Sequence, residues 1–324
     1  MKTLYGFILL ILSYHGHTET LISGKAINGE GLELLVVAHS DLITNTEIEL
    51  ARSRIASNGD FEVRFTLRET KPVFLRIGGQ EMEFVVEPGK SYNITISNLL
   101  EQQPRKKLPA RFGMPALQYQ ISGSNRYELN AMIAEFYAIH DRFLQENVHA
   151  LLRQRDNALT DMYSELINSS FPDFNNQYFK NLVFYNTALI RMMSPTTGIG
   201  QLYENYISGR PVLYSHPVYM EFFSQLFDKH LLTKAAYLRR EGLLLLLSSS
   251  DSFQAIIKAM EADPVIKEMR VKELVLLFSL RDVYFMSGFN KEQVLNCLRQ
   301  IQQMSTFSEH RLIARNMIAS FAAH

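Results

Sequence analysis

Cys297, the only cysteine in the 324-residue chain, is the first residue to consider for chemistry. A thiol acts as a nucleophile when a base and an electropositive site activate it, and disulfide exchange needs a second thiol. The chain has no C-x-x-C pair, so neither a redox pair nor an internal disulfide can form. Because Cys297 lies between Leu295 and Leu298 in a helical pattern, we predict that it is a small buried hydrophobic residue.

The histidines could bind a metal or transfer protons, but their spacing does not group them. No pair has the H-x-x-x-H spacing of a helical zinc site, and no carboxylate completes such a set in sequence. His140 falls on the apolar face of a predicted helix, where a core histidine is expected. The sequence therefore predicts no metal site from these nine residues, which are His15, His17, His39, His140, His149, His216, His230, His310 and His324.

Glu81, Glu83 and Glu87 alternate along one predicted strand and would share a face. Such a row could bind a cation or act as acid and base. It is more typical of the solvated side of a strand, where charge also discourages edge pairing, and we favour that interpretation.

Other motifs predict no catalytic residue and no cofactor. The "GIGQ" stretch (198–201) lacks the third glycine and the βαβ setting of a dinucleotide loop, and no G-x-S-x-G, P-loop or EF-hand sequence occurs. The sequence thus leans against an enzyme. Asn93 and Asn168 begin N-glycosylation sequons, which matter only in a eukaryotic secretory route.

Composition excludes some classes of partner. With 33 basic and 33 acidic residues, the chain has no global field that would attract nucleic acid. The cluster Arg105-Lys106-Lys107 could contact a phosphate or a membrane, but a run of three is typical of a solvated loop. No tryptophan accompanies the 21 Phe and 15 Tyr, which disfavours a sugar-stacking surface.

The N-terminal residues 1–18 are typical of a secretory signal peptide. One lysine precedes an apolar run from Leu4 to Leu12, which is too short to cross a bilayer. Small residues at Gly16 and Thr18, or at Thr18 and Thr20, could define the cleavage site, and the absence of a cysteine there argues against a lipoprotein anchor. A first β-strand is the alternative. We expect an exported protein of the periplasm or cell envelope, without a membrane span after signal removal.

Residues 21–97 predict a small antiparallel β-sandwich or open barrel. Asn28-Gly29, Asn58-Gly59 and Gly78-Gly79 separate apolar runs and are typical of two-residue hairpin turns. Alternation from Phe61 to Leu67 indicates a strand with one wet face. One more strand at 116–123 is expected to return to the sheet after a proline-containing linker at 98–115.

Residues 124–324 predict an all-α domain. The stretch 125–170 has neither Gly nor Pro, and Leu129, Ile133, Phe136, His140 and Phe143 recur at helical spacing. One helix of this length would span about 70 Å, longer than a 200-residue domain, so we favour a helical hairpin that breaks at 153–157.

Later helices have clearer starts. Asp263-Pro264, Asn290 with Gln293, and Thr306 with Glu309 are typical N-terminal caps. The run "GLLLLL" (242–247) is too short to cross a bilayer and predicts a fully buried helix. The fold class is therefore α+β, as two domains.

The stretches "ISGKAIN", "SNGDFEVRF" and "PVFLRIGGQEMEFVVEPGKSYNITI" carry a resemblance. They resemble the small N-terminal β-domain of unknown function in thioredoxin-like (TlpA-type) envelope disulfide reductases of Gram-negative bacteria. Gly59-Asp60-Phe61 and Glu87-Pro88-Gly89 match turns typical of that family. The helical segments around 209–231 and 270–301 look like the region that these proteins place before their thioredoxin domain, so the resemblance covers roughly residues 21–320.

Members of that family usually continue into a thioredoxin domain with a Trp-Cys-x-x-Cys active site, which this chain lacks. The family's redox activity therefore transfers to no residue here. We expect an exported, non-catalytic accessory or binding protein that acts through an envelope protein partner or a small ligand. One alternative is a truncated or split thiol-disulfide oxidoreductase whose redox domain is missing from this chain. A second is a β-domain that binds a glycan or peptide on its wet face or open edge.

Overall fold

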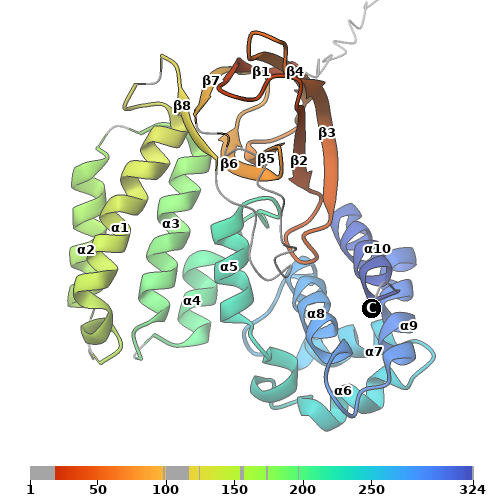
Figure 1. Ribbon diagram of the computed structural model, residues 1–324. Helices are drawn as coiled ribbons and strands as arrows, with labels where there is room; N and C mark the ends of the chain where they lie inside the picture. The colour runs from red at the N-terminus through yellow and green to blue at the C-terminus, as the bar shows by residue number, and fades with distance from the viewer. Residues whose placement is uncertain are drawn as a thin grey trace, which may run out of the picture. The chain divides into compact units, whose positions relative to one another are not determined.

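The computed structural model describes residues 19–97, 99, 117–123, 125–153, 157–172, 174–195 and 197–322. The predicted signal peptide (1–18) and all of the predicted linker except Leu99, including Arg105, Lys106 and Lys107, lie outside these residues. The chain divides into two compact units, one with the residues up to Val37 and from Glu49 to Gly123, the other with Ala38–Ile48 and the chain after Gly123. The first unit holds the β-sheets and the second the helices, so the predicted α+β organisation is confirmed (Figure 1).

The β-unit is a sandwich of two four-stranded sheets, with strand orders β4-β1-β7-β8 and β3-β2-β5-β6. Its core is formed by the alternating inward residues of both sheets, as the pattern from Phe61 to Leu67 predicted. The predicted returning strand is present as β8, which pairs antiparallel with β7. The strands are β1 (Glu19–Ala26), β2 (Glu33–His39), β3 (Glu47–Arg54), β4 (Asp60–Thr66), β5 (Lys71–Ile77), β6 (Gln80–Val86), β7 (Ser91–Ser97) and β8 (Gln118–Ile121).

Two of the three predicted hairpins are wrong. The turns at Asn28-Gly29 and Asn58-Gly59 join strands of different sheets, because β1 and β4 belong to one sheet while β2 and β3 belong to the other. Only Gly78-Gly79 joins two paired strands, β5 and β6. Each Asn-Gly pair forms a turn with positive φ at one residue, Asn28 or Gly59, but the packing of the two sheets decides whether the flanking strands pair.

β1 runs parallel to β7 on one side and antiparallel to β4 on the other. Gly24 lies at this crossing with φ of 154°, and a Cβ atom there would lie 1.8 Å from the carbonyl oxygen of Ile94. A residue without a side chain is therefore required where β1 passes β7.

The helical unit contains ten α-helices among the described residues. The predicted break is confirmed: α1 ends at Leu151, α2 begins at Ala158, and the two helices pack together with α3 on the same bundle (Figure 1). The helices are α1 (Leu129–Leu151), α2 (Ala158–Ser170), α3 (Gln177–Met192), α4 (Ile199–Tyr206), α5 (Pro217–Leu226), α6 (Arg239–Leu247), α7 (Ser252–Ala259), α8 (Met269–Tyr284), α9 (Lys291–Met304) and α10 (Ser308–Ala322). A π-helical turn, η1 (His230–Lys234), and a short 3₁₀ turn, η2 (Met260–Ala262), complete the unit.

The helix starts follow the predicted caps in part. Asn290 caps α9 by accepting from the backbone N–H groups of Glu292 and Gln293, as predicted. The prediction for Asp263-Pro264 is wrong, because α8 begins only at Met269. The Asp263 side chain accepts from Val265 and Ile266 N–H and also meets distant side chains, so it closes a turn.

At the start of α10, the hydroxyl of Ser305 accepts from the N–H of Phe307, and the helix begins at Ser308, so Thr306 does not have the predicted capping position.

The prediction of a fully buried helix at 242–247 is also wrong. Leu243 and Leu247 are buried in α6, but Leu245 is 71% exposed. Buried positions four residues apart define one apolar face, and the run of leucines continues around the helix onto its solvent side.

The loop between β2 and β3 belongs to the helical unit. Asn316 on α10 donates from Nδ2 to the hydroxyl of Ser40 at 2.9 Å and to Oδ2 of Asp41 at 2.8 Å. Asp41 in turn accepts from the N–H groups of Ile43 and Thr44, which closes the loop around the carboxylate. Within the described ranges, no helix is both long and apolar enough to span a bilayer.

Candidate functional site

Cys297 is fully buried on the inner face of α9, as predicted. Burial raises the pKa of its thiol to about 12. Since the thiolate is the reactive form and the thiol has no access to solvent, this residue cannot act as a nucleophile in the folded chain.

The predicted glutamate row does not form a joint site. Glu81 pairs with Arg76 across the β5–β6 hairpin, and Glu87 pairs with Lys90 in the following turn. Glu83 is exposed on β6, in agreement with the solvated face that we favoured. Among the described residues, no three His, Cys, Asp or Glu side chains are arranged to hold a metal ion.

Two buried histidines make no contact with a carboxylate among the described residues. His140 meets the hydroxyl of Tyr163 through Nδ1 at 2.8 Å, which confirms the predicted core histidine. His216 lies beside the carbonyl of Tyr178, with 3.1 Å between Nε2 and the oxygen, and its Nδ1 is buried without a partner. Burial lowers the pKa of His216 to about 4, because it removes water from the charged ring, and hydrogen bonds to backbone carbonyls oppose this shift only in part.

Two further histidines each meet a buried carboxylate, and the first such group is the Asp263 cluster (His230, Tyr237 and Asp263). Oδ2 of Asp263 lies 2.7 Å from Nε2 of His230 and 2.9 Å from the hydroxyl of Tyr237. Oδ1 accepts from the backbone N–H groups of Val265 and Ile266. Burial alone would raise the pKa of Asp263, but the hydrogen bonds from His230, the two N–H groups and Tyr237 outweigh it and hold this pKa below its ordinary value.

The second group is the Glu273 cluster (Tyr214, Glu273, Ser305 and His310). Oε2 of Glu273 accepts from the hydroxyl of Ser305 at 2.5 Å and lies 2.8 Å from Nδ1 of His310. The other ring nitrogen of His310, Nε2, lies 2.7 Å from the hydroxyl of Tyr214. An ionised carboxylate only accepts hydrogen bonds, so Nδ1 carries a proton and, in the neutral ring, Nε2 accepts from Tyr214.

This arrangement is not a nucleophile with its base. The hydroxyl of Ser305 is buried and donates to Glu273, and both nitrogens of His310 are already engaged, so His310 is not placed as a base for Ser305. Burial raises the pKa of Tyr214 well above its ordinary value, although Arg270 opposes this shift. The geometry holds the cluster together and does not activate it.

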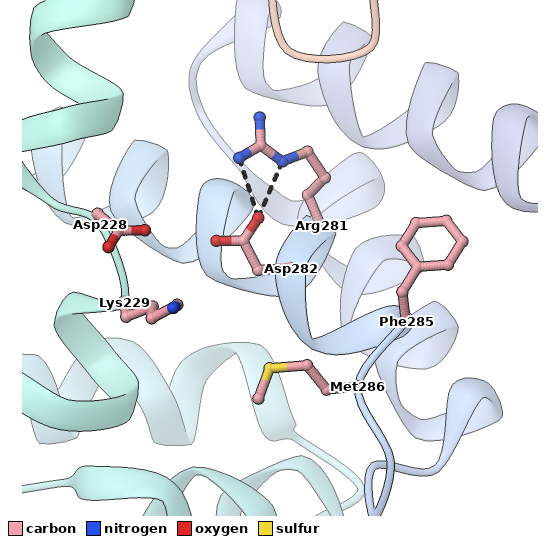
Figure 2. A pocket seen from close by; sticks show the side chains of 6 residues that line it. All are labelled: Asp228, Lys229, Arg281, Asp282, Phe285 and Met286. Carbon is pink, nitrogen blue, oxygen red and sulfur yellow. Dashed lines mark hydrogen bonds and ion pairs between the residues drawn. The ribbon is translucent and has the colours of Figure 1, made fainter. Parts of the chain in front are cut away.

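An open recess, which we call the Phe285 recess, lies between the end of α5 and the end of α8 (Figure 2). It has a volume of about 490 Å³ and is lined by Asp228, Lys229, Arg281, Asp282, Phe285 and Met286. Arg281 and Asp282 form an ion pair at 2.9 Å, whereas neither Asp228 nor Lys229 has an ion-pair partner among the described residues. Phe285 is 61% exposed, and its ring packs edge to face against Tyr284 and Phe321.

Backbone strain lies at the edge of this recess. Lys229 has φ of 50° and immediately precedes the π-helical turn η1, and Arg239 after the turn has φ of 55°. A left-handed conformation costs a residue with a side chain on the order of 1–2 kcal/mol, and such strain collects at functional sites. Lys229 lies in the wall of the recess.

A second recess, the Glu273 pocket, lies among α7, α8 and α9, with a volume of about 430 Å³. Its apolar walls are Phe253, Ile257, Met269 and Met304. Glu273 reaches it from the buried cluster. The sequence did not predict this site, because its residues lie on separate helices and match no known spacing.

No protein-family model matches the chain, and no curated protein matches it significantly. The resemblance to thioredoxin-like envelope proteins therefore stays a prediction based on the sequence stretches quoted above.

Proposed function

We propose that this chain is an exported, non-catalytic binding protein, related to thioredoxin-like envelope proteins, that recognises a protein partner through the Phe285 recess. The observation that carries the proposal is the composition of that recess. An exposed aromatic ring that packs against two others lines the same recess as an aspartate and a lysine that have no ion-pair partner among the described residues.

Aromatic anchors with nearby charges are the usual source of binding energy at protein interfaces. Phe285 loses little side-chain freedom on binding, because Tyr284 and Phe321 already hold its ring. Asp228 and Lys229 supply charges of both signs, which favour a partner of matching polarity and disfavour others.

The sealed thiol supports the non-redox part of the proposal. Thiol-disulfide exchange begins with a thiolate, and Cys297 is buried with its pKa raised to about 12. We expect the purified protein to show no reduction of insulin disulfides. Turnover of any thiol substrate by the purified chain would contradict the proposal.

The binding of a protein partner at the Phe285 recess is tested by cross-linking, with a photo-reactive amino acid at position 285 of the protein in its native cells. We expect a discrete cross-linked product that decreases with the second-site substitution Lys229→Glu. The matched control is the same label at Leu152, which is exposed at the end of α1 and lines neither recess. Equal labelling from both positions would contradict the assigned recess.

Export is tested separately, by cell fractionation and by the mass of the mature chain. Thr20 is fully buried in β1, and its hydroxyl accepts from the N–H of Gly89 at 3.0 Å. A cut after Thr20 would remove this bond, so cleavage after Thr18 suits the sandwich better. We expect a periplasmic protein that begins at Glu19, and a full-length cytoplasmic product would refute export.

A further inference from the structure

We propose that the Glu273 pocket is a second ligand site, which binds a primary ammonium group carried on an apolar body. This site goes beyond the function proposed above, since it shares no lining residue with the Phe285 recess. The two oxygens of the buried Glu273 carboxylate differ in their hydrogen bonds.

Glu273 is only 4% exposed, yet its side chain lines the pocket. Ser305 and His310 both bind Oε2. Among the described residues none donates a hydrogen bond to Oε1, and this oxygen is not fully buried, so it keeps some access to solvent. A carboxylate oxygen in a mostly apolar recess is an incomplete hydrogen-bonding group, and a donor from a ligand would complete it.

The charge of the pocket favours a cation. Glu261 and Glu273 oppose the single ammonium of Lys258, which leaves one excess negative charge among the lining residues. Lys258 and Glu261 are exposed at the rim, where solvent screens them, whereas Glu273 is buried and screened much less. The buried carboxylate therefore contributes most to the selection of ligand charge.

The walls of the pocket favour an apolar body next to that cation. Met269 and Met304 are both large exposed hydrophobic residues, and they flank the buried side chains of Phe253 and Ile257. Methionine side chains adapt to ligands of different shape, and a volume of about 430 Å³ is within the range of small-molecule sites. An alkylamine or the side chain of a lysine between apolar residues has the required chemistry.

The experiment uses three probes with the same apolar body and different charge: hexylamine, hexanol and hexanoate. Binding is followed in the full-length protein by the NMR signals of ¹³C-labelled methionine methyl groups, assigned by single Met→Leu substitutions. We expect hexylamine to shift the Met269 and Met304 signals saturably, at concentrations at least about tenfold lower than hexanol, and hexanoate to bind most weakly.

The decisive variant is Glu273→Gln. The amide oxygen can keep accepting from Ser305 and His310 while the amide nitrogen takes the place of Oε1, so the fold is expected to survive. We expect the preference for hexylamine over hexanol to disappear. The rim variant Glu261→Gln is the matched control and should change the preference less than about twofold. A third variant, Met304→Lys, places a cation at an exposed position of the wall and should weaken hexylamine binding while Met269 reports it.

Two results would overturn the proposal: equal binding of all three probes, or no saturable shift of Met269 and Met304 with hexylamine. The Met286 signal reports the Phe285 recess independently, so failure of this site and failure of the proposed partner site are distinguishable. A final pair of probes, the capped tripeptides Leu-Lys-Leu and Leu-Gln-Leu, identifies the source of the ammonium. Selective binding of the lysine peptide over hexylamine indicates a protein segment, and the reverse indicates a small amine.

Discussion

The Asp263 cluster and the Glu273 cluster have the same parts, a buried carboxylate, a histidine and a tyrosine, but they differ in how the carboxylate is used. Both oxygens of Asp263 accept two hydrogen bonds, from two side chains and two backbone N–H groups. In Glu273 one oxygen accepts two bonds and the other accepts none among the described residues, and the residue lines a pocket.

This difference separates a structural carboxylate from one that can bind a ligand. A buried ionised group is tolerated when all its acceptor sites are used, and it then holds distant segments in place. A carboxylate with one oxygen that accepts no hydrogen bond within the protein can still accept one from a ligand. Both carboxylates have a histidine neighbour, so the presence of the histidine does not distinguish the structural carboxylate from the one that can bind a ligand.

The largest expected effect is that of Asp263→Asn. The new NH₂ group faces either two backbone N–H donors or His230 and Tyr237. In the second case both must act as acceptors, which moves the His230 proton to Nδ1, a buried atom without a partner, so we expect a loss of about 3–5 kcal/mol in the free energy of unfolding. Urea unfolding followed by circular dichroism at 222 nm measures it. Asp228→Asn, at an exposed position of the Phe285 recess, is the control and should change stability little. A loss below about 1 kcal/mol for Asp263→Asn would mean that the cluster is not structural.

A histidine without a carboxylate partner should make stability depend on pH. Because the pKa of His216 is about 4 in the folded chain and 6.5 ordinarily, the unfolded chain binds more protons between these values. The free energy of unfolding therefore keeps the full contribution of the neutral His216 above pH 6.5. It falls by up to about 3 kcal/mol as the pH decreases toward 4. Asp263, with its lowered pKa, loses its contribution only in a more acidic range.

Unfolding at a series of pH values with His216→Phe tests this expectation. The phenyl ring keeps the packing against Tyr178 but cannot titrate, so the slope between pH 6.5 and 4 should become shallower. His140, whose pKa burial also lowers, should account for part of the remaining slope. An unchanged slope would assign the pH dependence to other groups.

Glu273→Gln should cost much less than Asp263→Asn, on the order of 1 kcal/mol or less. The reason is the free position of Oε1, which can receive the amide NH₂ without facing a donor. The two amide substitutions, measured under the same conditions, test the comparison of the clusters directly. Equal losses would show that Glu273 is as saturated as Asp263 and would remove the basis of the ligand site.

The smallest expected effect is that of Cys297→Ala, a loss of about 1 kcal/mol from the lost contacts of a buried sulfur atom. We expect partner cross-linking and amine binding to stay unchanged. In the native protein the thiol should not react with a maleimide, whereas in urea it should react completely. Rapid labelling of the folded chain would show that Cys297 is accessible and would revive a chemical role.

Several features of the fold could be predicted from local sequence. The alternation from Phe61 to Leu67 defined a half-buried strand, and the excessive length of 125–170 defined a break between two helices. The apolar neighbours of Cys297 predicted its burial. Each of these predictions depends on a period or a length within one element, which neighbouring residues specify on their own.

The predictions that were wrong concern which distant segment an element packs against. Asn28-Gly29 formed the predicted turn but joined strands of two sheets, and Asp263 used its carboxylate for distant side chains instead of starting a helix. The leucines at 242–247 indicated burial, but only tertiary packing decides which face of α6 is covered. A short local pattern contains no information about which remote surface will oppose it.

By itself, the sequence determined the division into a strand-rich and a helix-rich part, the approximate positions of most elements and the inert environment of the single thiol. Only the tertiary structure brought Tyr214, Glu273 and His310 together and placed Glu273 in the lining of a pocket. The physical reason is range: backbone preference and hydrophobic periodicity act over a few residues, whereas a buried polar cluster forms where several helices, distant in the chain, exclude water from the same place.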